Sequence, residues 1–184
     1  MFFQPGYLPA QTLANRTFIG STTKDGVTVP AYNATGQKFG LWNPAGSGRY
    51  LVPVRLTVGH ADATTPAITS IGLSYLANTG SAIATGAPIS AFTETAPING
   101  IVGQSPGDHM GRFTLAATTS APTFFYTLGL SQDSATPGTG LDVGIHEFSG
   151  DLIVPPGTYI GLGGAPLAPG QDLTASIVWF EIDI

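Results

Sequence analysis

The stretch DLIVPPGTYIGLGGAPLAPGQDLTASIVWFEIDI, from Asp151 to Ile184, contains two long strand patterns separated by glycine and proline. Between Trp179 and Ile184 the side chains alternate, which is the two-residue period of a β-strand. One face carries Phe180, Ile182 and Ile184, and the other carries Trp179, Glu181 and Asp183. Glycines from position 161 to 164 are expected to interrupt the earlier pattern. We predict that the last strand is central and that the other strands are arranged around it.

Short apolar runs in the rest of the chain predict further strands, and almost no segment shows helical periodicity. The expected strands cover residues 16–22, 27–32, 37–42, 49–60, 68–77, 112–117, 122–130 and 141–148. Pro53 lies inside the longest of these runs and predicts an edge or a bulge. The pattern weakens over residues 81–108, where we expect one or two short strands within a long loop.

This arrangement predicts an all-β protein built as a two-sheet antiparallel sandwich, with a jelly roll as the favoured topology. An immunoglobulin-like sandwich is the alternative, although its cysteine and tryptophan landmarks are absent. We expect an N-terminal arm over residues 1–15 and a single domain over residues 16–184.

Composition limits the classes of partner. Only 9% of the 184 residues are charged, against roughly 25% in an average soluble domain. This low value suggests that copies of the chain cover part of the surface, as a homo-oligomer. The net charge of −5 is segregated, with +4 up to residue 59 and −9 after it. Six basic residues are too few for a nucleic-acid interface. No apolar run is long enough for a membrane helix, and MFFQPGYLPA has no features of a signal peptide, so we expect a soluble protein.

Candidate catalytic groups are sparse. His60 and His109 each have an aspartate nearby in the sequence, but neighbouring strand residues point to opposite faces, so we expect these histidines and His146 to have no chemical function. Glu181 and Asp183 share one strand face, and we predict that this face meets solvent or a neighbouring subunit. The chain has no cysteine. We therefore assign no catalytic residue, no metal site and no cofactor, and predict that the protein is not an enzyme.

Aromatic residues are the candidates for partner contacts. Phe2, Phe3 and Tyr7 lie in the N-terminal arm without a regular period, and we expect this arm to contact a partner or a neighbouring subunit. Trp42, beside Asn43 at the end of a predicted strand, is the candidate for a ring that stacks on a sugar.

Two segments carry a resemblance to a known group. Residues 39–48, FGLWNPAGSG, and Leu152 to Gly157 together with the closing strand around Trp179-Phe180-Glu181 resemble small jelly-roll virion proteins of tailed bacteriophages. The resemblance covers about a third of the chain. It implies a non-enzymatic virion protein, such as a trimeric capsid decoration or cement protein that binds the major capsid protein or another virion protein. A carbohydrate- or receptor-binding module of a phage tail or head spike is the alternative.

Overall fold

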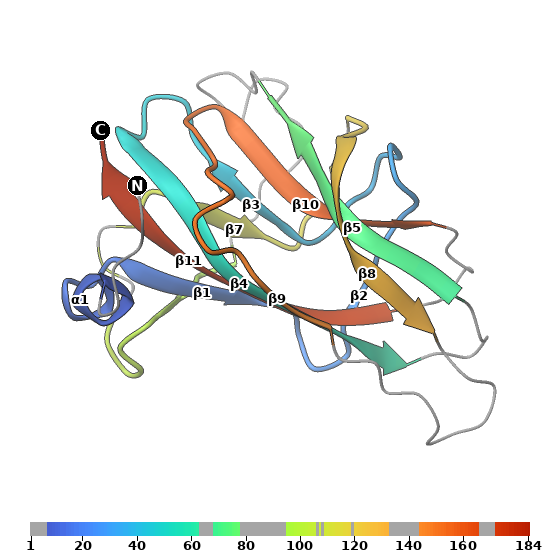
Figure 1. Cartoon of the computed structure of the whole chain (residues 1–184), viewed down its shortest axis with the longest axis horizontal. Coiled ribbons are helices and arrows are strands. Elements are labelled where there is room, and N and C mark those ends of the chain that lie inside the picture. The colour runs from blue at the N-terminus through green and yellow to red at the C-terminus, as the bar shows by residue number, and fades with distance from the viewer. Residues whose placement is uncertain are drawn as a thin grey trace.

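The computed structural model describes most of the chain and shows two antiparallel sheets packed as a sandwich (Figure 1). The described residues are 7–62, 68–77, 95–105, 107, 109–118, 120–132, 144–165 and 172–184. Within them the protein is nearly all β, which confirms the predicted fold class. The strand order is consistent with a jelly roll.

The two sheets contain eleven strands among the described residues. The first sheet has the order β6-β1-β11-β4-β9, with β2 also paired to β11, and the second has the order β7-β3-β10-β5-β8. In chain order the strands are β1 (Thr17–Ser21), β2 (Val27–Thr28), β3 (Gly40–Asn43), β4 (Arg49–Asp62), β5 (Ile68–Leu76), β6 (Ile98–Asn99), β7 (Arg112–Thr114), β8 (Thr123–Gln132), β9 (Gly144–Glu147), β10 (Thr158–Ala165) and β11 (Asp172–Asp183).

The C-terminal strand β11 is central, as predicted. It lies between β1 and β4, where Phe18 is opposite Trp179 and Val178 is opposite Arg55. Along most of β11 buried and half-buried residues alternate, so one face forms the core and the other faces outward. Trp179 is fully buried and packs at 5.8 Å, between ring centroids, from Phe18.

A bulge interrupts β4 next to Pro53. The pairing with β11 passes from Arg55 opposite Val178 to Pro53 opposite Trp179, which leaves Val54 as the extra residue. The predicted bulge is therefore confirmed. The bulge changes the register along β4, so that Leu51 on one side of it and Leu56 on the other are both buried.

The glycine-rich segment does not end its strand, contrary to our expectation. Gly161 pairs with Gly40 across β10 and β3, and Gly163 pairs with Gly72 across β10 and β5. Gly40 and Gly161 form a trough that accommodates the ring of Tyr159. A Cβ atom on Gly40 in β3 would lie 2.2 Å from that ring, and one on Gly161 in β10 would lie 2.5 Å from its hydroxyl, so β10 needs glycine where the sequence suggested a break.

A short helix, α1 (Tyr7–Leu13), is a second departure from prediction. Pro9 is tolerated because it lies in the first turn, where backbone N–H groups have no intrahelical acceptor. Figure 1 shows α1 beside β1, and Thr12 Oγ1 donates a hydrogen bond of 3.1 Å to Thr17 Oγ1. The described part of the predicted arm therefore contacts its own subunit.

Candidate functional site

The described residues bring polar groups together in two places, and neither contains three or more metal-ligating side chains. The first, which we call the Glu181 cluster, consists of Arg16, Arg49, Glu181 and Asp183 with the backbone of residues 110 and 111. The second, which we call the threonine hollow, is a depression of about 300 Å³ on the first sheet. It is lined by Thr22, Thr23, Lys24, Thr57, Gly59, Thr174, Ala175 and Ser176.

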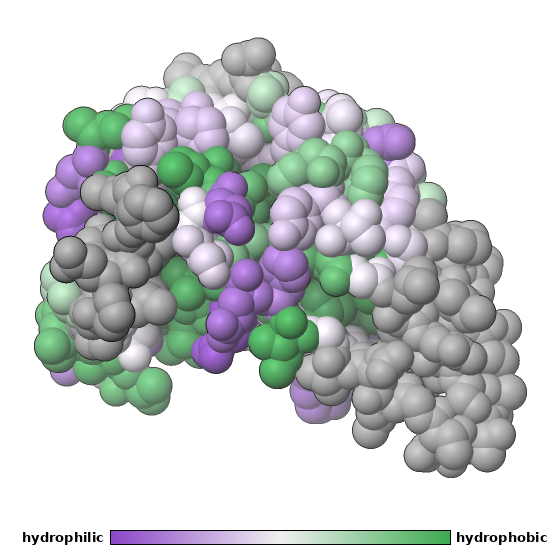
Figure 2. Space-filling model, in the orientation of Figure 1, coloured by the Kyte–Doolittle hydropathy of each residue, from purple (hydrophilic) through white to green (hydrophobic). Residues whose placement is uncertain are grey.

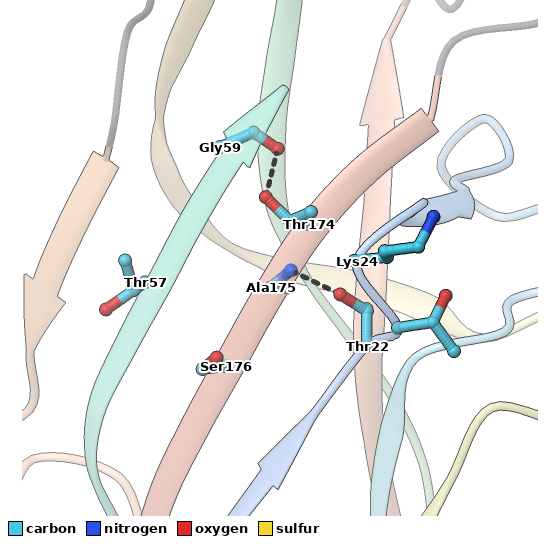
Figure 3. Close-up of a pocket in the computed structure, with 8 residues that line it drawn as sticks. Thr22, Lys24, Thr57, Gly59, Thr174, Ala175 and Ser176 are labelled. Atoms are coloured by element: carbon cyan, nitrogen blue, oxygen red, sulfur yellow. Dashed lines mark hydrogen bonds between the residues drawn. The ribbon is translucent and has the colours of Figure 1, made fainter. Parts of the chain in front are cut away.

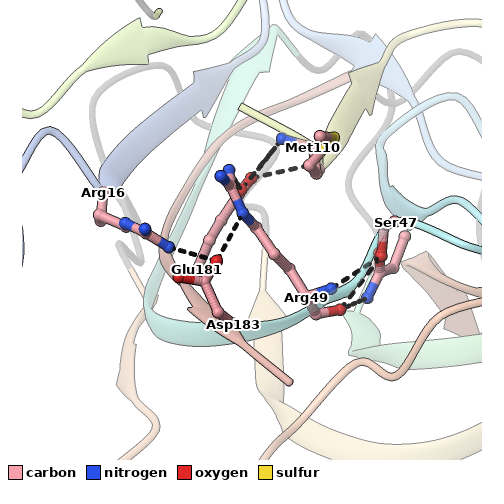
Figure 4. Close-up of polar contacts among 8 residues, drawn as sticks. Arg16, Ser47, Arg49, Met110, Glu181 and Asp183 are labelled. Carbon is pink, nitrogen blue, oxygen red and sulfur yellow. Dashed lines mark hydrogen bonds and ion pairs between the residues drawn. The ribbon is translucent and has the colours of Figure 1, made fainter. Parts of the chain in front are cut away.

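Glu181 is the centre of the first cluster (Figure 4). Its side chain is fully buried, and its two oxygens accept hydrogen bonds of 3.0 Å from the backbone N–H of Met110. Gly111 donates a second backbone hydrogen bond of 2.7 Å to Oε1. Arg49 Nη1 lies 2.9 Å from Oε2, and the Arg49 side chain is 13% exposed. The carboxylate is therefore satisfied by one guanidinium and two backbone donors.

Asp183 extends the cluster to the surface. Its Oδ1 atom accepts hydrogen bonds from Arg16 Nη1 at 2.6 Å and from Arg49 Nε at 3.0 Å. The hydrogen bond from Arg16 is the main cause that lowers the pKa of Asp183 below its ordinary value, and the same bond raises the pKa of Arg16. Both charged forms are favoured because each has its counter-ion within contact distance.

This cluster stabilises the fold by connecting several of its elements. Arg16 directly precedes β1, Arg49 begins β4, and Glu181 lies near the end of β11, so the cluster ties three strands to the segment before β7. A buried carboxylate that loses its donors is costly, which makes each partner important for stability. Our expectation that Glu181 faces solvent or a subunit is wrong. Its strand face is the inward one, and only Asp183 reaches the surface.

The threonine hollow has a different chemistry. Figure 3 shows that its side chains come from β4, β11 and the turn after β1. Thr22 Oγ1 accepts a hydrogen bond of 3.1 Å from the N–H of Ala175, and Thr174 Oγ1 donates one of 3.2 Å to Gly59 O. Lys24 at the rim forms an ion pair with Asp25. The lining offers hydroxyl groups and one ammonium group, which can form hydrogen bonds with a polar ligand. The threonine methyl groups can also pack against an apolar group.

His109 and His146, the two histidines whose side chains the structure describes, lie in separate places. His146 lies in β9, and its Nε2 is 2.9 Å from the hydroxyl of Tyr126 in β8, which links the edges of the two sheets. His109 is half-buried, with its ring centroid 5.8 Å from that of Phe18. His60 belongs to β4, and its side chain lies outside the described part. His60 and His146 therefore lie in strands that the sequence predicted.

The aromatic residues predicted to contact partners have mixed outcomes. Phe2 and Phe3 lie outside the described residues, and Tyr7 begins α1 with a side chain that is also outside them. Trp42 is only 5% exposed and packs with Tyr159 in a small cluster on the second sheet. The prediction of an exposed stacking ring at Trp42 is wrong, because residues around β3 and β10 cover it.

Comparison with known proteins adds no identification. Searches of protein-family models, of curated proteins and of solved structures returned no match to this chain. Among the described residues no helix has the length and apolar character needed to cross a bilayer.

Sequence analysis did not predict the Glu181 cluster. Arg49 and Glu181 are 132 positions apart, and only the antiparallel pairing of β4 with β11 brings them together. The available signal was an acidic residue in the same face as Trp179, since a carboxylate on a core-facing position requires a buried cation or backbone donors.

Proposed function

We propose that this protein is a non-enzymatic structural protein of a phage virion, a capsid decoration or cement protein that binds the capsid surface as an oligomer. The resemblance of residues 39–48 and of the closing strand to small jelly-roll virion proteins supports this proposal. The resemblance also favours a homotrimer as the oligomer and the major capsid protein as the partner.

The observation that carries the proposal is the character of the surface. Large apolar side chains are exposed on several strands of the sandwich, with Ile98 at 54% and Ile145 at 65% exposure. Tyr75 and Phe125 add a pair of rings that meet edge to face at 5.5 Å between centroids and are each 38% exposed. Exposed apolar groups in a chain with few charges are typical of surfaces that contact other proteins.

The polar contacts are compatible with the same role. Arg16, Arg49, Glu181 and Asp183 bond to one another and to the backbone, which stabilises the sheets. Their arrangement fits a durable subunit that has to withstand assembly on a particle.

Purified particles provide the test. We expect the chain to co-sediment with virions in a fixed ratio to the major capsid protein and to raise the temperature at which the genome is released. Particles stripped of the chain should regain this temperature when the purified protein is added. Particles that lack the chain, or that release the genome at the same temperature with and without it, would contradict the proposal.

A carbohydrate- or receptor-binding module is the second candidate, and the threonine hollow is the observation that favours it. Hydroxyl groups from Thr57 and Ser176 line an accessible depression beside Lys24. Because Trp42 is buried, this hollow replaces it as the candidate sugar site.

A glycan array distinguishes the two candidates. Specific glycan binding that is lost in Ser176→Val and kept in Lys38→Glu, an exposed site elsewhere, would support the module. Binding lost through unfolding is excluded by an unchanged melting temperature. Absence of glycan binding together with retention on particles would leave the decoration role as the proposal.

A further inference from the structure

Two opposite charges lie side by side on the outer face of the first sheet. Arg55 in β4 is directly opposite Glu147 in β9, and both side chains are exposed. Within the part of the chain that the structure describes, neither forms an ion pair. Both side chains are therefore available for ion pairs with a partner that carries an anion opposite Arg55 and a cation opposite Glu147.

The next outward-facing pair of the same two strands has a complementary shape. Thr57 in β4 is opposite Ile145 in β9. Ile145 is 65% exposed, and Thr57 forms one wall of the threonine hollow. A projecting apolar side chain thus lies beside a depression. Figure 2 shows hydrophilic residues through the middle of the view, around the position of β4 and β9 in Figure 1, with hydrophobic residues on both sides.

We propose that a second copy of this chain packs its β4–β9 outer face against the same face, around a twofold axis that runs parallel to these strands. In this contact Arg55 of each copy pairs with the partner's Glu147. Each Ile145 enters the hollow beside the partner's Thr57. The contact is a property of the chain itself and does not rest on the proposed role in a virion.

Twofold symmetry brings the Arg55–Glu147 ion pairs and the insertion of Ile145 beside Thr57 into one contact. An axis above the boundary between β4 and β9 exchanges the two members of every cross-strand pair of these strands. The axis that places Glu147 over Arg55 therefore also places Ile145 over Thr57. Two charge pairs and two apolar insertions follow from a single operation, as in an isologous interface.

The charge pattern favours a second copy over another partner. Arg55 and Glu147 are one cation and one anion at positions that a twofold axis interchanges, and Lys24 in the lining of the hollow is paired with Asp25, so the charges balance and the Arg55–Glu147 pair is complementary to itself. A partner of one sign would be attracted by one of these charges and repelled by the other. The twofold contact gives dimers, or paired trimers where a threefold contact also forms.

Charge reversal tests the contact in the full chain by sedimentation velocity over a range of concentrations. Arg55→Glu places two anions against each other in the dimer, and Glu147→Arg places two cations. We expect each single variant to weaken self-association at least about tenfold. An equimolar mixture of the two variants should associate again. One variant then carries glutamate at both positions, and the other carries arginine at both, so every charge meets its opposite across the interface.

Comparing the mixture with each single variant distinguishes a loss of association from a loss of folding stability. A variant weakened by repulsion between neighbouring strands of its own chain should show a lower melting temperature, and mixing leaves that repulsion within each chain unchanged. Lys38→Glu changes an exposed charge on another part of the chain and should leave association unaltered. Ile145→Ser should weaken association without a change of charge. A wild-type chain that does not form even-numbered oligomers, or a mixture that associates no better than its components, would overturn the proposal.

Discussion

Arg49 Nη1 lies 2.9 Å from Glu181 Oε2 at a place where the glutamate side chain has no solvent exposure. The two residues begin β4 and end the buried part of β11, so their contact fixes the register of the central strand pair at one end. A charge pair in this position is sensitive to removal of either partner, because the remaining charge stays buried.

Replacing Glu181 by glutamine should strongly destabilise the protein. The amide keeps the shape of the side chain but removes the anion that neutralises Arg49 and faces the N–H groups of Met110 and Gly111. We expect a loss of about 3 kcal/mol in the free energy of unfolding, measured with urea. Asp183→Asn is the matched control at the exposed end of the cluster, and its loss should be clearly smaller. Equal losses in both variants would show that burial of Glu181 has no special importance.

Acid should remove the contribution of the Asp183 carboxylate to the stability of the fold. Its folded-state pKa is lowered, mainly by the hydrogen bond from Arg16, so its charge stabilises the fold above the unfolded-state pKa of about 4. That stabilisation is lost as the pH falls through the lowered pKa. Melting temperatures of the wild type and of Asp183→Asn should therefore differ at pH 6 and converge toward pH 2. A difference that stays constant across this range would rule out the ionised carboxylate as its cause.

Alkali should destabilise the second sheet through Tyr159. This residue is fully buried, and burial raises its pKa far above the ordinary value of about 10. The neutral phenol stabilises the fold below the unfolded-state pKa, and this contribution decreases as the pH rises above it. In an absorbance titration at alkaline pH, one of the six tyrosines should ionise only with unfolding. Tyr159→Phe should remove that late step, and a step that persists in this variant would assign it to another tyrosine.

Much of the fold was predictable because it depends on short-range patterns. Strand alternation identified β1, β4, β5 and β8 within a few residues and the C-terminal half of β11, and Pro53 marked the bulge that the pairing of β4 with β11 contains. The errors arose where a distant contact decides the outcome. The local pattern predicted a strand break at Gly161, but this glycine lies under Tyr159 and beside Gln37, which no local pattern shows.

The candidate site was less predictable for the same reason. A glutamate in an alternating strand normally marks the solvent face, and Glu181 is inward only because Arg49 and two backbone donors reach it from elsewhere. Trp42 was expected to be exposed because it precedes a loop, but Tyr159 of the neighbouring strand β10 packs against it. The position of Arg55 opposite Glu147 likewise depends on strand register, which composition and periodicity do not supply.

Alanine at Gly161 provides a direct test of the glycine trough. An ideal Cβ there would lie 2.5 Å from the Tyr159 hydroxyl, 2.7 Å from Gln37 Oε1 and 2.9 Å from the backbone oxygen of Phe39. The last of these atoms cannot move without displacing β3, so we expect a loss of about 1–3 kcal/mol in the free energy of unfolding.

Gly129→Ala is the matched control for this test. Gly129 also lies in a strand, β8, but a Cβ there would meet no atom within 4 Å, and the residue is exposed. Its substitution should change the free energy of unfolding by less than about 0.5 kcal/mol. If both variants unfold at the same urea concentration, close approach of Tyr159 and Gln37 does not explain why β10 carries glycine at position 161. The role of glycine would then be limited to the backbone conformation of β10.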